Sequence, residues 1–230
     1  QSTNDSYPTA IKVALILRNE KLVAELTKLA GSFRAKGDAF LRIVKMGRTE
    51  LQDAVPMTVG QEFHAWAAAL ESEIQLLKDA EKSLSSVNMG ATAIGSMLNV
   101  PKGYPEKCAA ELATLTKRPI VPSSDMFAAT WDQQGFVVYS NALKSLAIKQ
   151  SKIAGDLILL ASGPRAGLGE IDLPALQPGS SIMPGKVNPV IPELVNVIAF
   201  RVIGNASAVD IAAHSGQLQL NAYEPIEGLA

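Results

Sequence analysis

The stretch of sequence that decides the fold is residues 63–84, which read FHAWAAALESEIQLLKDAEKSL. Large apolar side chains recur there at intervals of three, four or seven residues, at Phe63, Trp66, Leu70, Ile74, Leu77 and Leu84. Because an α-helix turns once in about 3.6 residues, this spacing places them on one face of a helix of roughly seven turns. The stretch therefore predicts a long amphipathic helix with a buried apolar face.

Helical spacing also appears on both sides of this stretch. A first helix is predicted to start with Pro8-Thr9 in or near its first turn and to run to about Gly37, with apolar residues at Leu15, Leu22, Leu26, Leu29 and Phe33. A third is predicted over about 124–160 and a last one from Asn188-Pro189 through Val195, Ile198, Val202 and Val209. Apolar residues on several faces indicate burial against other subunits as well as within the chain.

Strand signals are nearly absent from the sequence. No Asn-Gly turn joins two alternating apolar runs, and Ile43-Val44 is too short to count as a strand. We therefore predict an all-α, long-helix bundle that occupies residues 1–230 as one domain. The polar connectors are 45–60, 87–104, 162–187 and 214–217, and three of them carry the candidate chemistry.

Composition narrows the classes of partner. With 47% hydrophobic residues and a formal net charge of -1, the chain can bury a core but has no charge excess for nucleic acid or an anionic membrane surface. No apolar run is expected to reach the ~20 residues that cross a bilayer, and the N-terminus does not resemble a signal peptide. A cytoplasmic location is expected.

The single cysteine and the chain ends support two further expectations. Cys108 cannot form an internal disulfide and has no thiolate partner for a metal, so it is expected to be a small core residue, and no metal is expected. The chain opens without Met inside a polar motif and ends soon after a Pro-containing segment. We therefore expect a piece of a longer protein, truncated at both ends.

The connector before the last helix, residues 179–189, reads GSSIMPGKVNP. It combines hydroxyl, ammonium and amide groups with two glycines, and Asn188 followed by Pro189 is typical of a helix N-terminus. Such an end favours a bound carboxylate. Composition alone, however, favours an ordinary flexible loop with an ordinary helix cap.

The specific string changes that interpretation, because GSSIMPGKVNP resembles the signature loop of the aspartase/fumarase superfamily. Residues 1–5, QSTND, and residues 47–54, GRTELQDA, resemble two further blocks of that family in the expected order. The similarity extends over nearly all 230 residues. The resemblance implies a lyase that eliminates a group from a small dicarboxylic acid without an organic cofactor.

The resemblance also assigns roles to residues of this chain. In this family the first serine of the signature loop is the base, here Ser180, and the resulting dianion needs preorganised donors such as Lys186. Lys186, Asn188 and Thr49 would hold one carboxylate, and Ser2, Thr3 and Ser181 the one that gains charge. Asn4 would contact the leaving group. Glu193 would act through other residues or simply oppose the helix dipole, and both readings remain open.

Glu50 departs from the histidine that is usual in the fumarase form of this block. A carboxylate there would attract a substrate ammonium by an energy on the order of several kcal/mol at low dielectric, but would gain nothing from a neutral hydroxyl. The alternative is a solvated loop acid. Glu50 and the neighbouring strings favour the ammonia-lyase branch, which converts L-aspartate to fumarate; class II fumarase or another fumarate-releasing lyase is the alternative.

The family resemblance implies partners as well as chemistry. Members are homotetramers in which each active site draws its blocks from three subunits, and they carry further N- and C-terminal domains. We therefore expect residues 1–230 alone to be weakly active or inactive. A non-catalytic helical assembly module is the alternative of a different class. His64 and His214 lie outside the family blocks and are expected to be structural, the latter just after the last helix.

Overall fold

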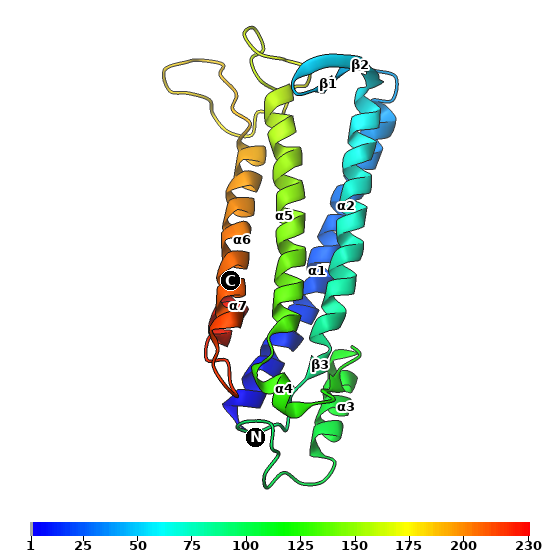
Figure 1. The fold of residues 1–230 in the computed structure, drawn as a ribbon. Coiled ribbons are helices and arrows are strands. Elements are labelled where there is room, and N and C mark those ends of the chain that lie inside the picture. The colour runs from blue at the N-terminus through cyan, green and yellow to red at the C-terminus, as the bar shows by residue number, and fades with distance from the viewer. Residues whose placement is uncertain (1) are drawn as a thin grey trace. The chain divides into compact units, whose positions relative to one another are not determined.

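The computed structural model describes residues 2–230 and is dominated by helices (Figure 1). The helices are α1 (Thr3–Ala39), α2 (Val59–Glu81), α3 (Tyr104–Thr116), α4 (Met126–Trp131), α5 (Gln134–Leu160), α6 (Val190–Ser215) and α7 (Glu224–Leu229), with a 3-10 turn, η1 (Lys82–Leu84). Two small sheets pair β1 (Val44–Thr49) with β2 (Gln52–Thr58) and β3 (Ser86–Val87) with β4 (Val121–Pro122). The prediction of an all-α, long-helix fold is confirmed.

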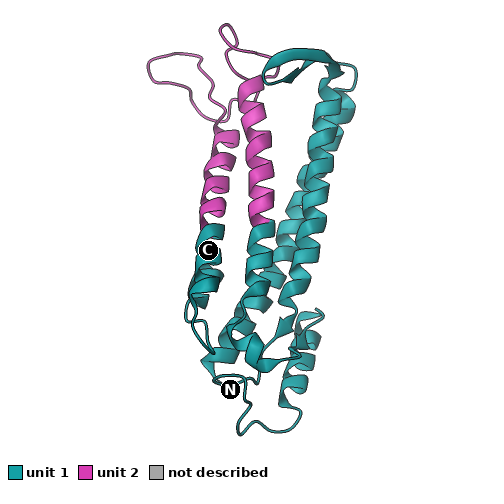
Figure 2. Ribbon diagram, in the orientation of Figure 1, with its two compact units in different colours: residues 1–142, 206–230 teal, residues 143–205 magenta. Residues whose placement is uncertain are grey.

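The chain divides into two compact units (Figure 2). One comprises residues 1–142 and 206–230, and the other residues 143–205. The first contains α1 to α4, both sheets and α7, whereas the second contains the long connector between α5 and α6. Helices α5 and α6 each contribute a segment to both units.

The core of the first unit lies between α1 and α2, which run side by side (Figure 1). The apolar face predicted for residues 63–84 is buried at every position. The rings of Phe63 and Trp66 are in tilted contact, with their centroids 4.8 Å apart, and Phe33 of α1 meets both rings edge-on at 5.9 and 5.8 Å. Burial of each such side chain stabilises the pair by about 1.5–3 kcal/mol.

Helix α1 begins five residues before the predicted Pro8 start. Ser2 caps it, because its Oγ accepts from the Asn4 N–H at 3.2 Å while the Ser2 N–H donates to Asp5 Oδ1 at 3.0 Å. This reciprocal capping box stabilises a helix start by about 1 kcal/mol. Pro8 is therefore inside the helix rather than in its first turn.

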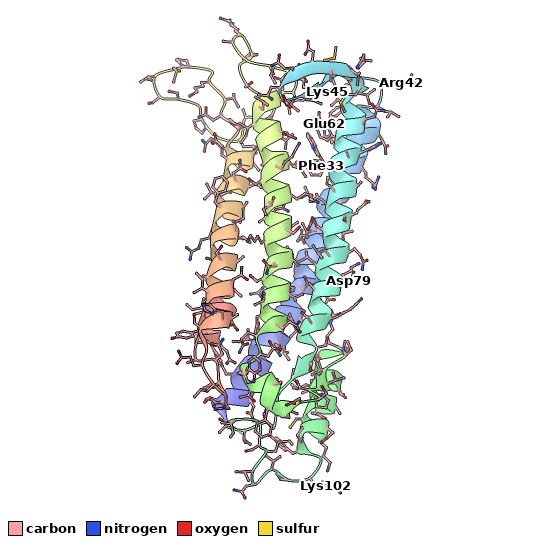
Figure 3. The ribbon with its side chains drawn as sticks, in the orientation of Figure 1. Phe33, Arg42, Lys45, Glu62, Asp79 and Lys102 are labelled. Atoms are coloured by element: carbon pink, nitrogen blue, oxygen red, sulfur yellow. The ribbon has the colours of Figure 1, made fainter. Side chains whose placement is uncertain are left out.

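The prediction that strands are nearly absent is wrong for residues 44–58. β1 and β2 form an antiparallel hairpin whose last pair is Thr49 with Gln52, so Glu50 and Leu51 are its two-residue turn. Both turn residues have positive φ, 53° and 63°, as a type I′ turn requires. Figure 3 shows Lys45 of β1 beside Glu62 of α2, and this 2.7 Å ion pair ties the hairpin to the helix.

The predicted third helix is two helices. The chain breaks between α4 and α5 at Asp132-Gln133, where the Asp132 carboxylate accepts from the Gln134 N–H at 3.0 Å. Short helices α3 and α7 fall in segments for which no helix was predicted. Each has proline in its first two positions, which fits the start of a helix but also reads as a loop signal.

Helix α6 begins at Val190, one residue after the predicted Pro189 start. By length and composition it could cross a membrane, so the expectation that no apolar run is long enough is wrong. Its surface is largely exposed within this chain, including Ile191, Leu194, Val197, Ile198, Phe200 and Ile211. Exposed apolar side chains gathered in this way, above all between Ile191 and Phe200, are typical of an interaction site.

Candidate active site

Residues 2–5 of the first family block, QSTND (residues 1–5, here called the N-terminal block), form the cap and the first turn of α1. Ser2 is the helix cap, Thr3 is exposed, and Asn4 is half-buried. The Asn4 side-chain amide donates to the Ala93 carbonyl at 2.8 Å. The predicted substrate-binding residues Ser2, Thr3 and Asn4 are thus adjacent on one helix end, where backbone N–H groups favour an anion.

Asp5 was not among the predicted site residues, although it is fully buried beside them. One carboxylate oxygen accepts from the Ser2 N–H, and the other accepts from the N–H groups of Gly90 at 3.2 Å and Thr92 at 2.9 Å. The Ser-x-x-Asp spacing signals the capping bond, but its contacts with residues 90 and 92 require tertiary structure. Asp5 therefore links the N-terminal block to residues 88–93.

The second block occupies the hairpin. Thr49 ends β1 and Glu50 starts the turn, and both side chains are exposed. Arg48 lies 3.8 Å from Asp53 across the strands. The 37-residue α1 separates this hairpin from the N-terminal block, and at 1.5 Å per residue that is about 55 Å (Figure 1). A single chain therefore does not bring Thr49 and Glu50 to Ser2, Thr3 and Asn4.

The signature loop lies in the unit formed by residues 143–205. Its two ends approach so closely that a Cβ added at Gly179 would meet the Lys186 carbonyl oxygen, which only glycine avoids. Ser180, next to that contact, is half-buried, and its Oγ accepts from the Ile182 N–H at 3.3 Å. Ser181 and Lys186 are exposed. The loop thus carries its hydroxyl and ammonium groups close to the point where Gly179 and Lys186 meet.

The loop leads directly into α6. Asn188 is half-buried just before the helix, and Glu193 is exposed in its first turn, with its N–H donating to the Pro189 carbonyl at 3.1 Å. This position suits a carboxylate that opposes the helix dipole, and it equally leaves Glu193 accessible to a neighbouring group.

The two histidines differ in their surroundings. His64 lies on α2 with its Nε2 at 3.0 Å from Asp38 Oδ1 and its ring against Gly37, in keeping with a structural role. His214 is in the last turn of α6 and not after the helix, so its predicted position is wrong. The side chain of Cys108 is half-buried on α3, so the expectation that it is a core residue is wrong.

A buried charge cluster near α7 has no counterpart in the sequence analysis. Glu224 and Glu227 are almost fully buried, as is Lys12 of α1. Burial raises the pKa of Glu224 to about 7 and that of Glu227 to about 8, and it lowers the pKa of Lys12. Within residues 2–230, no three His, Cys, Asp or Glu side chains are arranged to hold a metal ion.

Comparison with known proteins shows which family this chain is similar to. A family model described as "Lyase" matches residues 1–204. Aspartate ammonia-lyase of Pseudomonas canavaninivorans is 54% identical over 227 residues, which cover 98% of this chain and 48% of that protein. That of Escherichia coli K12 is 53% identical over 230 residues, covering 100% and 48%. The chain spans about half the length of these curated relatives.

Two solved structures share the fold. A crystal structure of fumarate lyase:delta crystallin from Brucella melitensis bound to cobalt has a TM-score of 0.96 at 51% identity, over all of this chain and 50% of that one. Recombinant class II fumarase from Schistosoma mansoni has a TM-score of 0.97 at 33% identity, over all of this chain and 51% of that one. Fold similarity is thus equal for the two, whereas sequence identity is not.

Proposed function

Since the chain belongs to the lyase family, within the aspartase/fumarase superfamily, we propose that the full-length protein is a cytoplasmic aspartate ammonia-lyase. The observation that carries the proposal is identity of 53–54% to aspartate ammonia-lyases over 98–100% of the chain. Identity to the class II fumarase is 33%. The proposed reaction is the reversible elimination of ammonia from L-aspartate to give fumarate.

In the proposed mechanism, the Ser180 alkoxide removes a proton from the carbon next to one substrate carboxylate. The electron pair moves into that carboxylate and gives an aci-carboxylate dianion, which Ser2, Thr3 and Ser181 would stabilise by hydrogen bonds. Return of the electron pair forms the carbon-carbon double bond and breaks the carbon-nitrogen bond, so that ammonia leaves beside Asn4. Lys186, Asn188 and Thr49 would hold the other carboxylate. Positioned donors and excluded water lower the cost of the dianion.

The separation of the blocks supports an assembly in which sites are shared. Because about 55 Å of α1 separates Ser2 from the hairpin within one chain, a complete site needs hairpins from other copies. The exposed apolar surface of α6 supplies a means of association. We propose a homotetramer whose active sites each use three subunits, and this surface is expected to face another protein chain rather than lipid.

Glu50 is proposed to favour amine substrates. At the tip of the hairpin its carboxylate is exposed and forms part of a two-residue turn. In an assembly that closes the site, loss of water would strengthen its attraction for an ammonium group. A turn acid that stays in solvent is the alternative role, because side-chain exposure in one chain is equally compatible with it.

Substrate choice can be tested directly by following fumarate absorbance. We expect the full-length protein to turn over aspartate and to show at least about tenfold lower kcat/KM with malate, argininosuccinate and adenylosuccinate, since only aspartate combines a small carbon skeleton with an ammonium leaving group. Turnover with malate alone would contradict the ammonia-lyase proposal and support a fumarase. No turnover of any of the four would support the non-catalytic assembly module.

Assembly can be tested at α6. Replacement of Val197 and Phe200 by Glu places two charges on the exposed apolar surface, so we expect the tetramer to dissociate and aspartate turnover to fall by at least about tenfold. Light scattering measures the mass, and circular dichroism checks that helices persist. Leu115→Glu, at an exposed leucine of α3, is the matched control and should leave the mass unchanged. Unchanged mass in the α6 variant would refute the proposed interface.

A further inference from the structure

We propose that residues 88–93 form a positioning element for the N-terminal block, with Asp5 as the residue that couples the two. The inference rests on the proposed function, because it concerns how Ser2, Thr3 and Asn4 are held ready for substrate. It adds residues that lie outside the three family blocks. All of them belong to the same compact unit.

The Asp5 carboxylate is the first link. It accepts a hydrogen bond from the Ser2 N–H at the start of α1. It also accepts hydrogen bonds from the N–H groups of Gly90 and Thr92 in the positioning element. Because the carboxylate is fully buried, these charge-assisted bonds are not in competition with water. Each N–H group is rigidly attached to the backbone, so the carboxylate fixes the distance between the two segments.

The second link arises from Pro8. A helical carbonyl normally accepts from the N–H four residues later, but Pro8 has none to offer Asn4. The side-chain amide of Asn88 donates to the Asn4 carbonyl instead, at 3.0 Å. Asn88 is itself buried, and its oxygen accepts from the Thr9 hydroxyl at 3.4 Å. The positioning element therefore supplies the hydrogen-bond donor that the Asn4 carbonyl lacks within the helix.

The third link sets the direction of the Asn4 side chain. The Ala93 carbonyl can only accept, so the NH2 group of Asn4 must be the end that faces it at 2.8 Å. This leaves the Asn4 oxygen, a pure acceptor, as the end available to substrate. An acceptor suits an ammonium group, which has three donors, better than a hydroxyl with one. The positioning element thus contributes to selection of an amine.

The backbone of the positioning element is held in an uncommon conformation. Thr92 has φ +62°, which costs a residue with a Cβ about 1–2 kcal/mol, and Gly90 has φ +95°. A Cβ at Gly90 would also lie 2.9 Å from the Pro105 ring. The bonds from both N–H groups to Asp5 offset this strain, so loss of the carboxylate should release the segment.

The test compares Asp5→Glu and Asp5→Asn with wild type in the full-length protein. Glutamate keeps the charge and can still close a capping box with Ser2, but its extra methylene moves the carboxylate relative to residues 90 and 92. Asparagine keeps the shape of the side chain and loses its charge. Because the two variants disturb the contact in different ways, the test can be made if either one folds. Glu25→Gln is the matched control, because exposed Glu25 bonds Lys28 of the same helix at 2.7 Å and lies 20 residues along α1 from Asp5, about 30 Å away.

Two readouts are expected to change together. Hydrogen exchange of the amides of residues 90 and 92 should accelerate at least about tenfold in both Asp5 variants, and kcat/KM for aspartate should fall about 10- to 100-fold, as misplacement of binding groups by about 1 Å does. The control should change neither readout.

The possible results separate the two proposals. Unchanged exchange at residues 90 and 92 would overturn the coupling through Asp5. Accelerated exchange with kcat/KM within twofold of wild type would overturn the positioning role. Absence of aspartate turnover in the wild-type protein would contradict the proposed function instead, and the exchange data would still decide whether Asp5 holds the segment.

Discussion

Replacement of Ser180 by Ala in the full-length protein is expected to lower aspartate turnover by about 10²–10⁴-fold, the contribution of a general base. The methyl group of alanine cannot accept the proton from the substrate carbon, and no other residue in the proposed site is assigned the role of base. The hydroxyl makes one weak local bond, at 3.3 Å to the Ile182 N–H, so its loss should not unfold the protein. Steady-state kinetics by fumarate absorbance measure the effect.

The Ser180 prediction requires that assembly and folding be unchanged. Light scattering and thermal unfolding of Ser180→Ala should match wild type, and fumarate should still bind. Ser32→Ala, at an exposed serine of α1 that bonds only its own helix, is the matched control and should keep full activity. Turnover within tenfold of wild type in Ser180→Ala would contradict the assignment of the base.

Replacement of Glu227 by Gln is expected to stabilise the protein at pH 8.5 by up to about 4 kcal/mol and to have much less effect at pH 5. Glu227 is 6% exposed, and within residues 2–230 neither of its carboxyl oxygens has a hydrogen-bond partner. Burial and the neighbouring Glu224 raise its pKa to about 8, against the attraction of Lys12. The groups that face this cluster are Lys12, Asp132, Gln133 and Glu224.

The direction of the pH effect follows from proton binding. Because the pKa of Glu227 is higher in the folded than in the unfolded state, the folded state holds the proton over a window from about pH 4.5 to about 8. Stability therefore falls as the pH rises through that window and levels off above it. Glutamine does not titrate and removes the part of this slope that Glu227 contributes, whereas Glu224, whose pKa is raised to about 7, still contributes its own part. Chemical unfolding at several pH values measures it.

A matched substitution checks the origin of the Glu227 effect. Glu106→Gln removes an exposed carboxylate in the first turn of α3, so it should leave the pH dependence of unfolding as in wild type. A Glu227→Gln protein whose free energy of unfolding follows the wild-type pH profile would show that Glu227 does not carry its proton in the folded state.

Local signals predicted the long helices but missed the hairpin and the short helices α3 and α7. The buried face of α2 follows from the spacing of Phe63, Trp66 and Leu70 alone, because one face of a long helix can be buried only if that spacing holds. At the hairpin, by contrast, Glu50-Leu51 lacks the Gly or Asn that marks a type I′ turn. Pairing of the strands and the Lys45–Glu62 ion pair override the preference of those two residues.

By itself, the sequence of this protein determined the long helices, the buried apolar face of α2 and the three polar blocks that resemble a lyase. These depend on residues close together in the chain, whose spacing is visible without a fold. Only the tertiary structure decided that α1 holds two blocks about 55 Å apart, that Asp5 reaches Gly90 and Thr92, and that Glu227 is buried beside Lys12. Those contacts join residues that are distant in sequence. Many different pairs of residues would fit the same local patterns, and only the packing of the folded chain selects the pairs that meet.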